Sequence, residues 1–282
     1  MQFGIVTPVL NGRAFFRACA ASVRAAATEA PSLRVSHYVR ESSRSKKPCT
    51  DLAETYGCSY VRTEDNGLYD AIEAGLDQAA TDGCDILAWL NADEQYLPGA
   101  LAAAERVFES NPKIGLVFGD YLLLDPQGKI LSARREIPAR LLYLRNSTNY
   151  LLSCTVFFRR SVWNDFGGFN RSYRLVADKE FYLRLLQNGV HAALITQYVG
   201  AYTATGQNAS LSPDAVAEWT RLRREAGAFA SKPLRIAVRS LRLLEKAVHG
   251  CFFPTFVKTA LFAPDGSRHT VRTLAGSTWK WK

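Results

Sequence analysis

The residues best suited to chemistry lie in short acidic and polar turns, the first of which contains Asn91, Asp93 and Glu94. This turn directly follows the apolar run Ile86–Leu90. The shortness of the run, its Ile and Trp content and its abrupt polar end favour a buried strand over a helix. In open α/β sheets, ligands bind at the carboxyl ends of the strands. The turn is therefore either a ligand site or an acidic surface turn that only solvates a strand end.

Two further acidic turns stand in the same relation to an expected strand. Glu41 follows the expected strand Arg34–Val39, while Glu64 and Asp65 follow the expected strand Ser59–Arg62. If the strands are parallel neighbours, all three turns lie at one edge of the sheet. That convergence favours a real site over three unrelated surface turns.

The elements expected around these turns alternate between strands and helices. This alternation predicts an α/β fold with a mostly parallel central sheet and helices on both faces. A hairpin is expected between Tyr121–Leu124 and Lys129–Leu131. The other strands are expected at Phe3–Val6, Leu116–Tyr121, Cys154–Arg159 and Ala192–Val199, and the helices at Arg13–Ala27, Thr50–Tyr56, Leu68–Ala80, Ala100–Phe108, Arg160–Phe166 and Asp178–Gln187.

Cysteine usage and hydropathy exclude several classes of protein. The six cysteines are scattered without a CxxC pair, which argues against a zinc site or a disulfide framework and favours a reducing compartment. The N-terminus is interpreted as a strand at once, not as a signal peptide. No uninterrupted apolar run is long enough to cross a bilayer. The sequence predicts a cytoplasmic protein.

Basic residues are concentrated in the C-terminal part of the chain. The net charge is +9, from 35 Lys and Arg against 26 Asp and Glu. From Arg221 onward there are 13 basic and 3 acidic residues, which gives +10 and leaves −1 for residues 1–220. The main domain therefore gives no charge argument for nucleic-acid binding.

Six segments, in this order along the chain, resemble those of family 2 glycosyltransferases with the GT-A fold, of the type that builds bacterial surface polysaccharides. They cover roughly residues 1–205 and are Val6–Gly12, Glu64–Leu76, Leu87–Leu101, Phe118–Tyr121, Phe157–Phe169 and Ala177–Leu185. The resemblance implies a catalytic domain over residues 1–210 with a Rossmann-like sheet. Its donor half would lie at about 1–100 and its acceptor half at about 101–210. Residues 211–282 would form a basic, helical, amphipathic extension.

The resemblance implies transfer of a sugar from a nucleotide-sugar to an acceptor hydroxyl, with inversion at the anomeric carbon. The departing nucleoside diphosphate gains negative charge, which a divalent cation, Mg2+ or Mn2+, would neutralise. Asp93 is the expected metal ligand, because Mg2+ needs only one or two carboxylates beside the diphosphate oxygens. Glu94 is either a second ligand through water or a solvated acid.

Asp178 matches the position of the family's general base, which takes the proton from the acceptor. The alternative for Asp178 is an acid that stabilises a helix N-terminus. Glu180 should face another side of the helix and is not expected to share the role. The residues implied in donor-nucleotide binding are Thr7, Pro8, Glu41, Asp65, Gly67 and Asn91. The implied donor is linked to UDP, GDP or dTDP, and the implied acceptor is a saccharide or lipid-linked.

The chain departs from the family pattern at several positions. Glu41 and the cationic loop Ser42–Lys47 replace an Asp and a Gly/Ser-rich acidic loop, so the donor identity stays open. The loop cations either reach the diphosphate or are solvated. The family's Asp-Asp is Asp93-Glu94 here, and Ser153-Cys154 stands where relatives often have His-Gln. Tyr69 is interpreted as a core aromatic.

The segment 234–263 has two interpretations. Its apolar residues follow helical spacing, with arginines on the remaining arc, and four phenylalanines occur between residues 252 and 262. Either it lies on an anionic membrane surface, at the inner face of the cell membrane, or its apolar face packs on the catalytic domain.

Two other functions remain as alternatives. A sugar nucleotidyltransferase would need a Gly-rich basic loop after the first strand, which Val6–Gly12 lacks. A catalytically degenerate protein of the same fold would act as a membrane-surface adaptor and show no metal-dependent affinity for a nucleotide.

Overall fold

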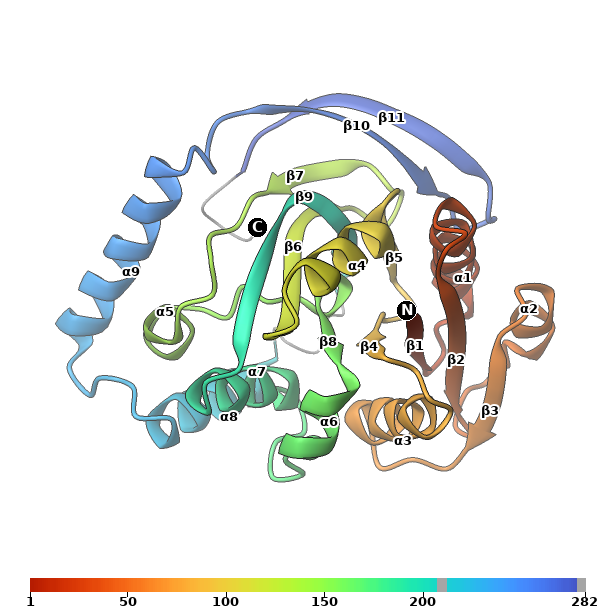
Figure 1. Cartoon of the computed structure of the whole chain (residues 1–282), viewed down its shortest axis with the longest axis horizontal. Helices are drawn as coiled ribbons and strands as arrows, with labels where there is room; N and C mark the ends of the chain where they lie inside the picture. The colour runs from red at the N-terminus through yellow and green to blue at the C-terminus, as the bar shows by residue number, and fades with distance from the viewer. Residues whose placement is uncertain (207–211, 278–282) are drawn as a thin grey trace.

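One large twisted sheet organises the chain, and the computed structural model describes it over residues 1–206 and 212–277 (Figure 1). The strand order is β3-β2-β1-β4-β8-β6-β9-β5, with β7 paired to β6. Strands β3, β2, β1, β4, β6 and β9 run in one direction, and β8, β5 and β7 run against them. The sheet is thus mostly parallel, as expected. Its strands are β1 (Gln2–Val9), β2 (Arg34–Ser42), β3 (Ser59–Thr63), β4 (Ile86–Trp89), β5 (Glu94–Tyr96), β6 (Ile114–Leu124), β7 (Ile130–Arg134), β8 (Phe157–Arg159) and β9 (His191–Thr203).

Helices cover both faces of the sheet, as alternate residues of the central strands demonstrate. Ile86 and Ala88 of β4 pack in the core that includes residues of α1 and α4, while Leu87 and Trp89 pack in the core that includes residues of α3, α6 and α7. Both cores are therefore anchored by one short strand whose side chains point alternately to the two faces. The helices are α1 (Arg13–Glu29), α2 (Thr50–Thr55), α3 (Leu68–Thr81), α4 (Ala100–Ser110), α5 (Leu141–Asn146), α6 (Arg160–Phe166) and α7 (Ala177–Gln187), with a 3-10 turn at Ser153–Thr155.

The C-terminal part adds two helices and a hairpin. Helices α8 (Pro213–Glu225) and α9 (Lys232–Val248) confirm a helical extension, and β10 (Thr255–Phe262) with β11 (Arg268–Ala275) forms an antiparallel hairpin that was not expected. Figure 1 shows the hairpin arching from the end of α9 across to α1. The predicted boundary between residues 210 and 211 lies outside the described residues. No helix in residues 1–206 or 212–277 is long and apolar enough to cross a membrane.

Asp120 marks the place where the extension meets the sheet. This residue of β6 is buried, and its Oδ1 accepts a hydrogen bond from the Glu136 amide at 2.7 Å. Burial raises the pKa of Asp120 to about 7, the neighbouring charge of Glu136 also raises it, and Arg135 and Lys246 oppose the shift. The folded chain therefore holds a proton on Asp120 that the unfolded chain loses above its ordinary pKa near 4.

We expect Asp120→Asn to flatten the pH dependence of stability. Because the pKa of Asp120 is raised in the folded state, wild-type stability falls as pH rises from about 4 to about 7. Asparagine keeps the oxygen that accepts from the Glu136 amide and has no charge. The free energy of unfolding of the variant should therefore lack this fall, which is on the order of 1–3 kcal/mol. Urea unfolding at a series of pH values measures the difference. An exposed-acid control, Asp165→Asn, should keep the wild-type slope, and parallel curves for D120N and wild type would contradict the assignment.

Candidate functional site

The turn after β4 supplies the oxygen ligands of the candidate site. Glu94 is fully buried at the start of β5, and Asn91 and Asp93 are partly exposed before it. The Asn91 amide donates to Glu94 Oε2 at 2.8 Å, and Ser153 Oγ donates to both Glu94 oxygens at 2.8 and 3.0 Å. Asn91 Nδ2 also donates to Ser153 Oγ at 3.2 Å. Glu94 therefore stabilises the turn through these buried hydrogen bonds and is not a solvated acid.

Asp93 fits a divalent cation. Burial raises the pKa of its carboxyl, and within residues 1–206 and 212–277 no ion pair of Asp93 is found. Asn91 Oδ1, two residues away, is buried without a hydrogen-bond partner. In the part of the chain that the structure describes, Asn91 Oδ1 thus lacks a donor and Asp93 has only the hydrogen bond from its own backbone amide, a shortage of positive charge that a bound Mg2+ or Mn2+ would relieve. Over the same residues no cluster of three His, Cys, Asp or Glu that could hold a metal occurs, so diphosphate oxygens would have to complete the shell.

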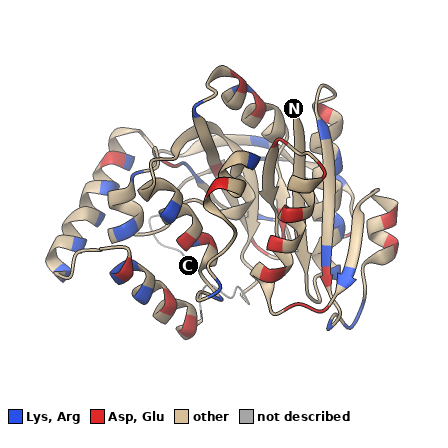
Figure 2. Ribbon diagram, turned by 60° about the horizontal axis from the view of Figure 1, so that its bottom comes forward, with Lys and Arg blue, Asp and Glu red and all other residues tan. Residues whose placement is uncertain are grey.

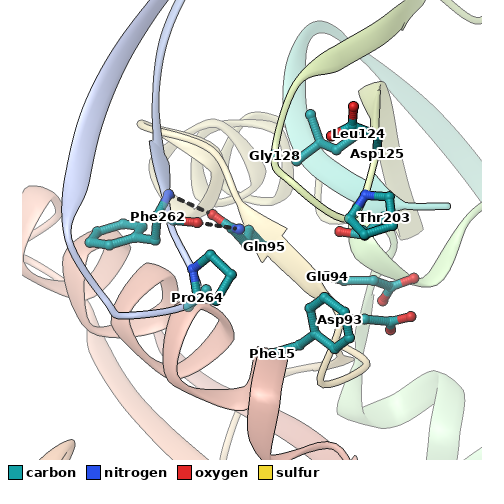
Figure 3. A pocket seen from close by; sticks show the side chains of 12 residues that line it. Phe15, Asp93, Glu94, Gln95, Leu124, Asp125, Gly128, Thr203, Phe262 and Pro264 are labelled. Carbon is teal, nitrogen blue, oxygen red and sulfur yellow. Dashed lines mark hydrogen bonds between the residues drawn. The ribbon is translucent and has the colours of Figure 1, made fainter. Parts of the chain in front are cut away.

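A hollow beside Asp93 is bordered by the C-terminal hairpin. It spans about 310 Å3 including the open solvent at its mouth, and Asp93, Glu94, Thr203, Phe262 and Pro264 are among the residues that line it (Figure 3). Gln95 fixes the hairpin here, because its Nε2 donates to the Phe262 carbonyl and its Oε1 accepts from the Phe262 amide, both at 2.9 Å. The hairpin therefore forms part of the wall of the site and is held there by Gln95, two residues after Asp93.

Asp178 lies in the first turn of α7 and is held by Tyr69. The Tyr69 hydroxyl, from the first turn of α3, donates to Asp178 Oδ1 at 2.7 Å. Burial and the charge of Asp178 raise the Tyr69 pKa well above its usual value, so the phenol keeps its proton and remains a donor. Glu180 is buried and paired with Arg184, with 2.8 Å between Oε1 and Nε. Within residues 1–206 and 212–277, Asp178 accepts a hydrogen bond at Oδ1 and none is found at Oδ2, whereas Glu180 is held by Arg184.

An aromatic stack connects the helix of Asp178 to the strand that precedes the turn at Asn91 and Asp93. Trp89, the last residue of β4, stacks on Tyr182 with 5.9 Å between ring centroids and 9° between planes. Tyr182 is one helical turn after Asp178 on the same helix. The charges of both Asp178 and Glu94 raise the pKa of Tyr182, which locates the two acids near one hydroxyl. The carboxyl end of β4 and the N-terminus of α7 therefore meet.

Thr7, Pro8 and Glu41 lie inside strands instead of in the turns that the sequence suggested. Thr7 and Pro8 are buried in β1, and Thr7 Oγ1 bonds to His37 Nε2 at 2.8 Å. Glu41 is buried near the end of β2, and its Oε2 accepts from the Cys49 amide at 2.9 Å and from the Tyr60 hydroxyl at 2.6 Å. Glu41 Oε1 is buried without a partner. An unpaired carboxylate oxygen at this strand end is suited to accept from a donor group of a ligand.

Asp65 and Gly67 form the entrance to α3. Asp65 Oδ1 accepts from the Gly67 amide at 3.0 Å and from Arg44 Nη2 at 2.6 Å. Gly67 has φ 132° and ψ −177°, a backbone conformation that a side chain would strain. The loop cation Arg44 is therefore not merely solvated, because it pairs with Asp65 at the entrance to α3.

Sequence reasoning missed three contributors to the site. Tyr69 was interpreted as a core aromatic and its ring does pack against the core, but the bond of its hydroxyl to Asp178 was not foreseen; its position two residues after the turn glycine Gly67 was a signal for it. Ser153 replaces a family residue and instead holds Glu94. The hairpin residues Phe262 and Pro264 precede Asp265-Gly266, a dipeptide typical of hairpin turns.

Comparisons with known proteins show the family of the chain. The model of the family described as "Glycosyl transferase family 2" matches residues 4–166. Proteins of Mycobacterium bovis and Mycobacterium tuberculosis named "PGL/p-HBAD biosynthesis glycosyltransferase" are 30% identical over 145 residues, 51% of this chain and 52% of theirs. This chain thus spans about half the length of these relatives.

Solved structures show the same fold at low sequence identity. S. aureus TarS 1-349 in complex with UDP-GlcNAc superposes with a TM-score of 0.61 at 16% identity, covering 88% of this chain and 73% of that one. The mannosyltransferase PcManGT from Pyrobaculum calidifontis, in complex with GDP-Man and Mn2+, gives 0.56 at 14% identity, covering 88% and 75%. These neighbours establish the fold of the chain.

Proposed function

The chain belongs to glycosyl transferase family 2, and on this premise we propose that it is an inverting glycosyltransferase dependent on a divalent cation. The observation that carries the proposal is the Trp89–Tyr182 stack, which holds the helix of Asp178 against the strand that ends in the Asn91–Asp93 turn. A candidate metal ligand and a candidate base are thereby brought to one edge of the sheet. These are the two groups that the reaction needs on opposite sides of the anomeric carbon.

The donor nucleotide is proposed to lie across the ends of β1 and β2, in the half of the domain at about residues 1–100. Glu41 Oε1 would accept from the base or ribose. Because the Thr7 hydroxyl is bonded to His37, Thr7 and Pro8 would flank the base through the backbone. Asp65 and Gly67 would lie near the diphosphate, with amides at the start of α3 contributing. The half at about 101–210 would face the acceptor, and 211–282 would be the extension.

The proposed metal ligands are Asp93, directly, and Asn91 Oδ1, weakly or through water. When bound, Mg2+ or Mn2+ would neutralise the charge that develops on the departing diphosphate. Glu94 is proposed to act from outside the metal shell, because both of its oxygens already accept hydrogen bonds. Burial and the neighbouring charge of Asp93 raise the pKa of Glu94 to about 8, which a nearby cation would oppose.

Asp178 is proposed to act as the base. Its Oδ2 would take the proton from the acceptor hydroxyl as the acceptor oxygen forms a bond to the anomeric carbon. The bond from that carbon to the diphosphate oxygen breaks with its electron pair on the nucleotide, so the configuration inverts. Tyr69 orients the carboxylate by donating to Oδ1, which leaves the other oxygen for the acceptor.

The acceptor is proposed to be a saccharide or a lipid-linked sugar of the cell surface, reached in the cytoplasm at the inner face of the cell membrane. In residues 1–206 and 212–277 all six cysteines are free thiols, which fits a reducing compartment. The donor is proposed to be linked to UDP, GDP or dTDP, a range to which the UDP-GlcNAc and GDP-Man of the structural neighbours belong.

Thermal shift with UDP, GDP, dTDP and CMP, each with and without Mn2+, tests the proposal. A ligand at about 100 times its Kd stabilises the fold by about 2.7 kcal/mol. For a chain of this size that is a rise in Tm of roughly 5–10 °C. We expect such a rise with one nucleotide and only with Mn2+. No rise with any nucleotide would favour the adaptor, and a response to a nucleoside triphosphate with release of pyrophosphate would favour a nucleotidyltransferase.

A further inference from the structure

Helix α9 turns its charged side toward the catalytic domain. Lys246 is buried, and its Nζ lies 2.8 Å from Glu136 Oε2, which Arg242 also approaches at 3.9 Å. Glu245 pairs with Arg140 at 2.6 Å and accepts from the Tyr143 hydroxyl at 2.5 Å. Rotating the helix would carry Lys246 and Arg242 away and leave Glu136 buried without a partner, which costs several kcal/mol. The orientation of α9 is therefore fixed by ion pairs.

The opposite side of α9 is apolar and faces solvent. Leu241, Leu244 and Val248 lie on one arc of the helix and are 49, 61 and 77% exposed. The packing interpretation therefore fails for this arc of α9. It holds for other apolar residues of the segment 234–263, because Val238, Cys251, Val257 and Leu261 are buried in the cores of the domain. An amphipathic helix that binds its own domain through the polar face leaves the apolar face for another surface. In Figure 1, α9 lies at the outer edge of the molecule.

The exposed apolar strip continues past the end of α9 into the hairpin. Phe253, in the connection, is 71% exposed. Phe256 of β10 pairs with Leu274 of β11, and these side chains are 65 and 69% exposed. We call the six residues of this strip the rim surface: Leu241, Leu244, Val248, Phe253, Phe256 and Leu274.

Cations accompany the rim surface on the hairpin. On the face of the hairpin that carries Phe256–Leu274, the next cross-strand pair is Lys258–Arg272, and both side chains are exposed. Like charges directly opposite each other destabilise a hairpin, so this pair has no evident value for folding. Arg239 is exposed on α9, and Figure 2 shows mainly basic positions along this helix at the left of the view. An anionic surface would balance these charges.

We propose that the rim surface docks on a membrane rich in anionic lipid, with the apolar side chains in the headgroup region and Lys258 and Arg272 on lipid phosphates. Exposed Phe and Leu beside Lys and Arg are what such an interface binds. A second copy of the chain fits less well, because the segment from Arg221 onward carries +10 and two such segments would repel. Docking needs no nucleotide, so it can be tested independently of the proposed reaction. If the acceptor is lipid-linked, docking would bring the protein to its acceptor.

Vesicle flotation with the full chain tests this inference. We expect the protein to float with vesicles of equal parts phosphatidylcholine and phosphatidylglycerol, to stay behind with pure phosphatidylcholine, and to be released by salt. K258S/R272S should weaken binding about thirtyfold, since each cation contributes about fivefold. L241S/L244S should weaken it by about tenfold or more for each leucine. The matched controls R106S/K113S and L131S change exposed residues elsewhere and should bind as wild type.

Circular dichroism confirms that each variant is folded, and sedimentation measures its mass. Failure of folded wild-type protein to bind anionic vesicles overturns the inference, as does equal binding by the rim variants. A dimer that L241S/L244S dissociates, without vesicle binding, assigns the rim surface to a second copy and also overturns it. Vesicle binding without metal-dependent nucleotide binding supports the docking surface while refuting the proposed reaction.

Discussion

Asp178→Asn is expected to lower the rate of sugar transfer by about 10³-fold and to leave donor binding unchanged. General-base catalysis contributes about 10²–10⁴-fold. Asparagine has the shape of aspartate, and its Oδ1 can still accept from Tyr69, so the variant should fold and keep its geometry. What it loses is the ability to take a proton from the acceptor.

The measurement is the initial rate of nucleotide release with the acceptor present, beside the donor-dependent shift in Tm. Asp165→Asn, an exposed isosteric change on α6, is the matched control and should keep the wild-type rate. Transfer at the wild-type rate by folded D178N would show that Asp178 is only the acid of a helix N-terminus.

Tyr69→Phe is expected to lower the rate of transfer less than Asp178→Asn does. It removes the hydroxyl that donates to Asp178 Oδ1 and keeps the aromatic ring, which lies 5.0 Å from Phe169. If Tyr69 positions the base, the rate of transfer should fall about tenfold. One hydrogen bond to a charged group contributes about 1.5–3 kcal/mol, and the Asp178 carboxylate recovers part of this by reorienting. Donor binding should not change. In the double variant Y69F/D178N the tyrosine change should cost nothing further, since its effect runs through Asp178.

Local patterns predicted the first half of the fold well and the C-terminus less well. The apolar run at Ile86 and the turn glycine before α3 specify their elements through short-range rules, and both elements were found. Strand β5 escaped prediction because Glu94 opens it, and a buried acid in a strand depends on the distant partner Ser153. The β10–β11 hairpin packs on the sheet through Val257 and Leu261, a long-range contact that periodicity does not reveal.

The contacts of the candidate site residues could not be predicted from the sequence. Glu41 was expected in the turn that ends its strand, but β2 continues to Ser42 because β3 pairs with it as far as that residue. Tyr69 lies next to Asp178 only in the fold, since 109 residues separate them in the chain. The direction of α9 depended on Glu136, whose pairing with Lys246 outweighs the usual preference of an apolar face for the domain core. In each example the position of the residue or helix depends on a partner that is distant in the sequence.

Asp93→Asn is expected to abolish the Mn2+-dependent part of donor binding and to lower transfer by about 10³-fold. A metal that stabilises the charge of a leaving group contributes several kcal/mol, and its affinity here depends on one direct carboxylate. Asparagine keeps the size of the side chain and removes the negative charge. The neighbouring Asn91 and Glu94 cannot replace it, because Asn91 is neutral and both Glu94 oxygens are already bonded.

Calorimetric titration of the donor with and without Mn2+ measures this effect directly. Asp125→Asn is the matched control, because Asp125 lines the same hollow but accepts from the Gln127 and Lys129 amides in a tight turn. The control should keep the full response to Mn2+, while D93N should bind the donor equally with and without the ion. Removing the charge also relieves the raised pKa of Glu94, so D93N should be at least as stable as wild type without metal. A variant that lost donor binding but kept a normal Mn2+ response would place the metal elsewhere and leave Asp93 as a sugar ligand.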